Sequence, residues 1–87
     1  MRTVYKYPLV GARRRDIIVP KGSNLLYVNT DLEGKICAWF MVDTNETESE
    51  KVCFLVTFTG FPLPNDNLIY KSSFKLDNII AHVFLVQ

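Results

Sequence analysis

The sequence is poor in the residues from which metal sites, disulfide frameworks and catalytic centres are usually built. It has a single histidine, His82, and two cysteines, Cys37 and Cys53, among 87 residues. Such a set cannot supply the nitrogen and sulfur ligands of a structural zinc ion, so we expect no metal and no cofactor. Two cysteines are too few for a disulfide framework. Because both lie in apolar runs, we expect them to behave as small hydrophobic residues.

An excess of charge and a long hydrophobic run are also missing. The net charge is only +1, which argues against a nucleic-acid partner, because nucleic-acid domains usually carry a marked basic excess. No apolar run has the length needed to span a bilayer, and residues 1–7 lack the apolar core of a signal peptide. We therefore expect a soluble, intracellular protein with no membrane partner.

Catalytic and nucleotide-binding motifs are equally scarce. No serine stands in the Gly-x-Ser-x-Gly context of a nucleophile turn, and neither Gly11 nor Gly22 begins a phosphate-binding loop followed by a helix. His82 lies between Ala81 and Val83 in an apolar stretch, where a structural histidine is the common outcome. The sequence therefore predicts that the chain is not an enzyme.

What the sequence does contain is a series of short apolar or alternating runs separated by turn residues. The runs expected to form strands are 2–9, 16–19, 24–30, 35–42, 51–59, 68–76 and 79–86. No segment shows a helical period long enough to require a helix. The pattern predicts one all-β domain over residues 1–87, a compact antiparallel sandwich or small barrel of about seven short strands.

Residues 35–42 are expected to be the strand around which the others are organised. The short connection before them predicts an antiparallel hairpin with residues 24–30, and the acidic loop 43–50 predicts a second hairpin with residues 51–59. Residues 68–76 have one apolar face and one mostly polar face, so we expect this strand near the edge of a sheet. Residues 79–86 are apolar on both faces, so we expect this strand to be central.

The organising strand also raises the question of what covers its second face. We expect Trp39 and Met41 to pack inward, which leaves Ala38 and Phe40 on the other side. Several other runs also have two apolar faces. A single small domain cannot easily bury so many apolar faces. This surplus favours a homo-oligomer in which subunits bury the second face.

The loop 60–67 is the first candidate binding segment. Its glycine and two prolines favour a rigid surface loop, and it carries two hydrophobic residues, Phe61 and Leu63. Tyr70 follows in the next run, and tyrosine is favoured in contact surfaces, although in a small β domain it also lines the edge of the core. We predict Phe61, Leu63 and Tyr70 as partner-binding residues.

A basic run is the second candidate. Arg13, Arg14 and Arg15 are adjacent on an expected connection, and Lys21 could lie nearby. Three guanidinium groups can hold a phosphate by bidentate hydrogen bonds. The alternative is a solvated loop that keeps the protein soluble.

Several short motifs together resemble a known family. They are Lys6-Tyr7-Pro8-Leu9, Pro20-Lys21-Gly22, the strand end Cys37-Ala38-Trp39-Phe40-Met41-Val42-Asp43, Thr59-Gly60 and the closing Ala81-His82-Val83-Phe84. In order and spacing, these motifs resemble a family of small uncharacterised proteins found largely in phages and prophages. The three arginines, the acidic loop and the Phe61-Pro62-Leu63-Pro64 segment depart from the family pattern. The resemblance implies the host cytoplasm as location and assigns no catalytic residue.

Three functions are consistent with these observations. The first is a non-enzymatic phage accessory protein that binds a host protein and inhibits an antiviral defence system. The second is an oligomeric binder, or sponge, of a small phosphorylated ligand such as a signalling nucleotide. The third is a virion component.

Overall fold

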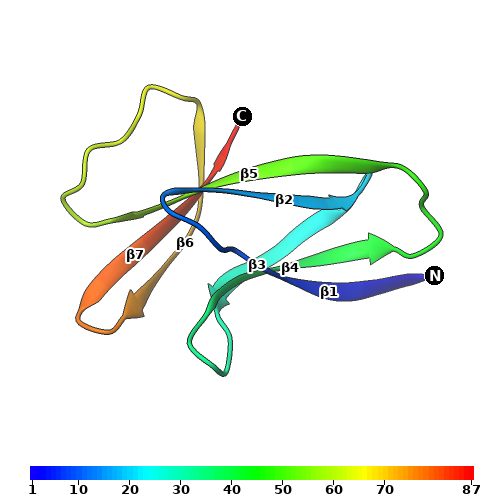
Figure 1. Ribbon diagram of the computed structural model, residues 1–87, viewed down its shortest axis with the longest axis horizontal. Helices are drawn as coiled ribbons and strands as arrows, with labels where there is room; N and C mark the ends of the chain where they lie inside the picture. Colours follow the sequence, from blue (N-terminus) through cyan, green and yellow to red (C-terminus); the bar gives the residue numbers. More distant parts are fainter.

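The computed structural model describes residues 1–87 and contains seven β-strands (Figure 1). The strands are β1 (Arg2–Pro8), β2 (Arg14–Pro20), β3 (Asn24–Thr30), β4 (Ile36–Asp43), β5 (Ser49–Phe58), β6 (Leu68–Leu76) and β7 (Ile79–Val86). Each strand overlaps one predicted run, and the predicted all-β class is confirmed. Arg14 and Arg15, which were expected on a connection, belong to β2 instead, because that strand begins two residues earlier than the apolar run predicted. The fold contains no helix long and apolar enough to cross a membrane.

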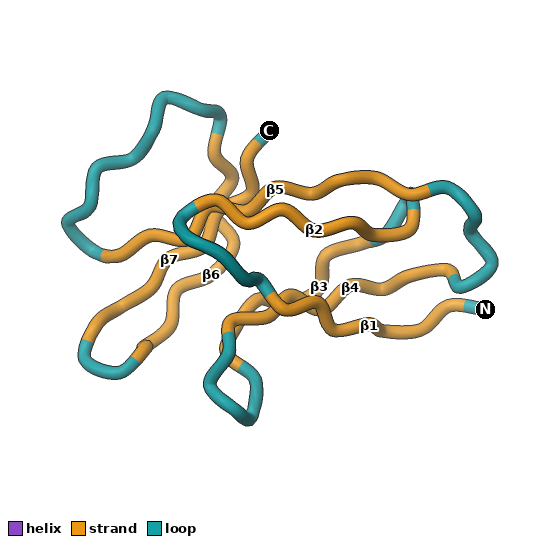
Figure 2. The backbone as a smooth tube through the Cα atoms, in the orientation of Figure 1, coloured by secondary structure: helices purple, strands orange, loops and turns teal.

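The strands form two antiparallel sheets, so the fold is a sandwich rather than a closed barrel. A three-stranded sheet has the order β1-β4-β3, and a four-stranded sheet has the order β2-β5-β7-β6. Figure 2 shows that loops make up a small part of the chain, the longest of them between β5 and β6. The expected positions of β6 at an edge and β7 inside its sheet are confirmed.

One of the two predicted hairpins is wrong. β3 and β4 pair as expected, with Thr30 opposite Ile36. β5, however, pairs with β2 and β7 in the other sheet and makes no ladder with β4. The physical reason is that β1 and β3 already occupy both edges of β4, so the acidic loop must cross from one sheet to the other.

The predicted orientation of β4 is also wrong. Ala38 and Phe40 belong to the core cluster between the sheets, and the Phe40 ring meets Phe54 of β5 edge-on at 6.3 Å. Trp39 and Met41 alternate with these residues and lie on the opposite face, where Trp39 packs on Tyr27 with ring centroids 5.6 Å apart. A period of two tells which residues share a face, but the position of the second sheet decides which face is buried.

Candidate protein-binding surface

Arg13 of the β1–β2 connection and Arg14 at the start of β2 hold the β5–β6 loop in place. Arg13 donates one hydrogen bond to the Thr57 hydroxyl, at 3.3 Å, and another to the carbonyl oxygen of Pro62, at 2.7 Å. Arg14 forms an ion pair with Asp66 at 2.6 Å, and this hydrogen bond raises the pKa of the Arg14 guanidinium. Two segments far apart in the sequence are thereby tied together, and the loop has a defined position against the sheet.

The remaining basic residues of the predicted anion site are also engaged within the chain. Arg15 donates from Nε to the carbonyl oxygen of Ala12 and from Nη1 to that of Leu9, and burial lowers the pKa of the Arg15 guanidinium. Lys21 lies at the other end of β2, where its Nζ is 3.6 Å from a carboxylate oxygen of Glu48. The four predicted anion-binding residues therefore do not converge on one point.

The predicted partner-binding residues, in contrast, lie on one surface. Phe61 and Leu63 are 55% and 50% exposed and line a shallow hollow of about 250 Å³ together with Phe84. Tyr70 is 57% exposed, and its ring packs against Phe84 with centroids 5.8 Å apart. We call these four residues, Phe61, Leu63, Tyr70 and Phe84, the loop face.

Phe84 was not among the predicted site residues. It lies in the apolar run of β7, which reads as core. The signal that could have found it is the register, because Phe84 stands directly opposite Tyr70 in the β6–β7 ladder and so shares its face.

The start of the β5–β6 loop is shaped by a tight turn. Gly60 has a φ of 92°, a left-handed conformation that glycine adopts without strain, and the Phe61 amide donates to the Phe58 carbonyl oxygen at 3.0 Å. The rings of Phe58 and Phe61 consequently meet edge-on at 5.7 Å. Phe61 is thus exposed in a fixed orientation.

A chain of hydroxyl groups surrounds His82 beside the loop face. Tyr70 donates to the Ser73 hydroxyl at 2.8 Å, Ser73 lies 2.7 Å from His82 Nδ1, and Thr59 lies 2.8 Å from His82 Nε2. Each ring nitrogen has one hydroxyl partner, and because a hydroxyl group can donate or accept, Ser73 and Thr59 can satisfy either neutral tautomer of His82. These contacts link β6, β7 and the residue that follows β5.

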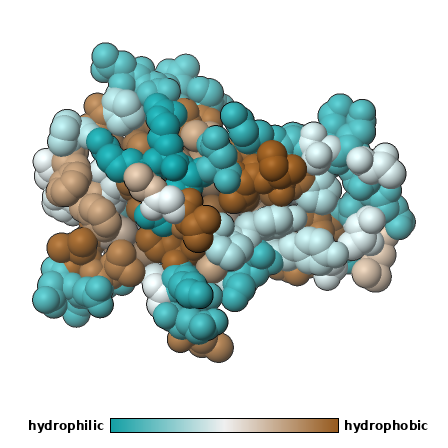
Figure 3. All heavy atoms as spheres, viewed as in Figure 1, coloured by the Kyte–Doolittle hydropathy of each residue, from teal (hydrophilic) through white to brown (hydrophobic).

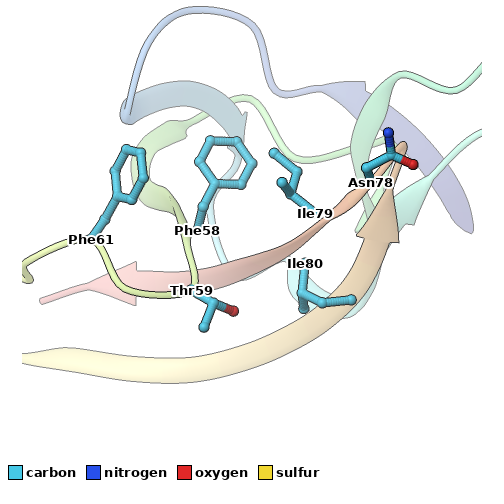
Figure 4. Close-up of a pocket in the computed structure, with 6 residues that line it drawn as sticks. All are labelled: Phe58, Thr59, Phe61, Asn78, Ile79 and Ile80. Atoms are coloured by element: carbon cyan, nitrogen blue, oxygen red, sulfur yellow. The ribbon is translucent and has the colours of Figure 1, made fainter.

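A larger hollow opens at the end of the four-stranded sheet. It has a volume of about 540 Å³ and is lined by Phe58, Thr59, Phe61, Asn78, Ile79 and Ile80 (Figure 4). Figure 4 shows Phe58, Phe61 and Ile79 directed to the same side of the ribbon. We call these six residues the end hollow. The sequence does not predict Ile79 and Ile80 of the end hollow as site residues, because they begin an apolar run that is typical of a buried strand.

Both cysteines are free thiols. Burial raises the pKa of Cys37 and of Cys53, which favours the neutral thiol form of each. No group of three or more histidine, cysteine, aspartate and glutamate side chains is placed to hold a metal ion.

Comparison with known proteins gives a family without an assigned activity. Residues 1–87 match the profile of a family described as a domain of unknown function, DUF7352. No curated protein and no solved structure matches the chain. By this match over its whole length, the chain belongs to the DUF7352 family.

Proposed function

We propose that the chain is a non-enzymatic accessory protein that binds a partner protein through the loop face. The resemblance to phage and prophage proteins supports a partner from a bacterial host, and an antiviral defence protein is the candidate that we favour. The loop face is the binding surface because it joins exposed hydrophobic side chains from two separate parts of the chain.

The observation that carries the proposal is the convergence of Phe61, Leu63 and Tyr70 around Phe84. Contiguous exposed apolar surface usually marks an interaction site, and aromatic side chains often supply most of the binding energy. A solitary exposed hydrophobic residue would not support the same conclusion, because scattered ones are common on soluble proteins.

The rigidity of the surface adds to this support. Arg13 and Arg14 hold the β5–β6 loop at two points, and the turn at Gly60 orients Phe61. A surface that is already ordered loses less conformational entropy on binding than a flexible loop does. The loop face is therefore suited to bind with its present shape.

Capture of a small phosphorylated ligand has less support. The guanidinium groups of Arg13, Arg14 and Arg15 already donate to carbonyl, hydroxyl and carboxylate oxygens of the chain. A phosphate would have to displace these contacts and loosen the β5–β6 loop. Calorimetric titration with a panel of nucleotides tests this second function, and binding heat from any of them would restore it. Mass spectrometry of purified particles tests the virion role.

Affinity capture with a matched pair of variants tests the main proposal. The test variant carries Leu63→Ala and Tyr70→Ala, and the control carries Val10→Ala and Ile18→Ala, which remove hydrophobic side chains that are 76% and 60% exposed outside the loop face. Each protein is immobilised and incubated with bacterial host lysate, and the retained proteins are quantified by mass spectrometry.

We expect one host protein to be retained by the wild type and by the control, and lost from the test variant. Circular dichroism of both variants checks that the sheets are intact. Equal recovery on the test variant and the wild type would exclude the loop face as the binding surface.

A further inference from the structure

Leu32 is the most exposed of the large hydrophobic residues, with a relative accessibility of 107%. It occupies the second position of the turn between β3 and β4, which is closed by a hydrogen bond of 3.0 Å from the Gly34 amide to the Asp31 carbonyl oxygen. Turns of this kind usually carry polar residues. A single exposed leucine needs no explanation by itself, but here the rest of the turn holds it in one place.

Asp31 makes the turn rigid. Its Oδ1 accepts hydrogen bonds of 2.9 Å from the amides of both Glu33 and Lys35, and its Oδ2 accepts from the Lys6 ammonium group at 3.1 Å. The Asp31 amide also donates to the Lys35 carbonyl oxygen at 2.8 Å. The turn therefore presents Leu32 as a preformed knob that needs no further ordering to make a contact.

The end hollow has the complementary character. Ile79 and Ile80 are 48% and 42% exposed, and with Phe58 and Phe61 they give the hollow a mainly apolar lining. Its volume of about 540 Å³ accommodates a branched aliphatic side chain with part of its turn. The β3–β4 and β6–β7 turns both lie along the lower side of the view in Figure 1. Hydrophobic side chains are visible at the tip of the β3–β4 turn and over the lobe of β6 and β7 in Figure 3.

Charges around the knob and around the hollow also match. Glu33 and Lys35 follow Leu32 at the end of the β3–β4 turn, whereas Lys75 and Asp77 come from the end of β6 and the turn that precedes Ile79. All four are exposed, and none forms an ion pair within the chain. A knob seated in the hollow can pair Glu33 with Lys75 and Lys35 with Asp77, which fixes its orientation.

We infer that a second copy of this chain occupies the end hollow with its Leu32 side chain, and that the two copies exchange knobs about a two-fold axis. A two-fold arrangement uses the same surface on both subunits, so each contact occurs twice and the assembly closes as a dimer. The end hollow shares Phe61 with the loop face and is otherwise separate from it. Because the variants that test the two proposals all leave Phe61 in place, either proposal can fail without the other.

Sedimentation velocity over a series of protein concentrations tests the dimer. We expect the wild type to form a dimer, and we expect Leu32→Ala, which removes the knob, to weaken dimerisation at least about tenfold. Ile79→Asp, which places a charge in the hollow, is expected to do the same. The control is Val10→Ala, which removes a hydrophobic side chain that is 76% exposed and lies outside both the knob and the hollow. It should leave dimerisation unchanged. Circular dichroism in dilute solution checks that each variant is folded.

Mixing the two defective variants gives the sharper test. Leu32→Ala keeps an intact hollow and Ile79→Asp keeps an intact knob, so their mixture can form a heterodimer with one good contact, whereas neither variant can do so alone. Recovery of dimer in the mixture supports the exchange. A monomeric wild type, a dimer that is insensitive to Leu32→Ala, or a mixture that stays monomeric would each overturn the inference.

Discussion

The two parts of β5 show how similar residues come to have different roles. Phe54 and Phe58 are four residues apart on this strand and therefore share a face. Phe54 is fully buried and meets Phe40 of the opposite sheet, whereas Phe58 is partly exposed, meets only Phe61 among aromatic rings, and lines the end hollow. The closed part of the sheet is thus core, and its open end is a candidate contact surface.

The difference comes from the extent of the opposing sheet. The core cluster contains Phe54 and Val83, but it includes neither Phe58 nor Ile79, which lie further toward the β6–β7 turn. Apolar residues at that end are no less hydrophobic than those in the core. Phe58 and Ile79 keep exposed surface because they lie outside the cluster that the two sheets enclose, so an apolar strand position indicates burial only where a second layer is present.

The largest expected effect is a loss of stability on substitution in the closed part of the four-stranded sheet. Phe54→Ala should lower the free energy of unfolding by about 3–5 kcal/mol, because it removes a fully buried ring and leaves a cavity. Phe58→Ala is the matched control and should lower it clearly less, since that ring is already partly solvated. Urea denaturation followed by circular dichroism measures both. Similar losses for the two variants would show that the open end is covered as well as the closed part.

The next largest effect concerns the hydrogen bonds by which Arg13 holds the β5–β6 loop against the sheet. Arg13→Ala should lower the free energy of unfolding by about 1–3 kcal/mol, because it removes the hydrogen-bond partner of the buried Thr57 hydroxyl and frees the Pro62 carbonyl. Arg2→Ala, at an exposed position without an ion pair, is the control and should change little. The same urea experiment serves here. Equal stability of both variants would show that the loop is held by other contacts.

Acid should weaken the turn that presents Leu32. Hydrogen bonds to Asp31, first from the Lys35 amide, lower the pKa of its carboxyl to about 2, below the ordinary value of about 3.9 in an unfolded chain. The unfolded state then binds more protons between these values. The stabilisation is therefore present above about pH 4 and is lost as the pH falls toward 2.

Asp31→Asn should reduce this loss, which thermal unfolding across the acidic range can measure. Asp43, whose pKa is lowered first by the Asn45 amide and then by the N-terminal amino group, should preserve part of the acid dependence in the variant. Identical profiles for the wild type and Asp31→Asn would contradict the assignment of the effect to this turn.

The smallest effect on stability is expected at the open end itself. Phe61→Ala should change the free energy of unfolding by only about 0.5 kcal/mol, because the side chain is more than half exposed. The same substitution should reduce partner capture, since Phe61 belongs to the loop face. A large loss of stability would instead assign Phe61 to the core.

The local features of the sites could be predicted, but their combination could not. Phe61 and Leu63 were identified from a loop stiffened by prolines, and Tyr70 from its residue type, whereas Phe84 and Ile79 read as core residues of an apolar strand. The sequence shows the arginines as an adjacent basic group and predicts an anion site or a solvated loop, whereas two of their acceptors, Pro62 and Asp66, lie about fifty residues away in sequence. No short-range pattern reports such a pairing.

The sequence by itself determined the seven strands, because alternation and turn residues act over a few neighbours. It also determined which residues of β4 share a face, since side chains alternate along any strand. Only the tertiary structure decided that Ala38 and Phe40, rather than Trp39, face the core, and that β5 leaves β4 for the other sheet. These outcomes depend on how far each sheet extends and which strand edges are already occupied, and that is settled by contacts between distant segments.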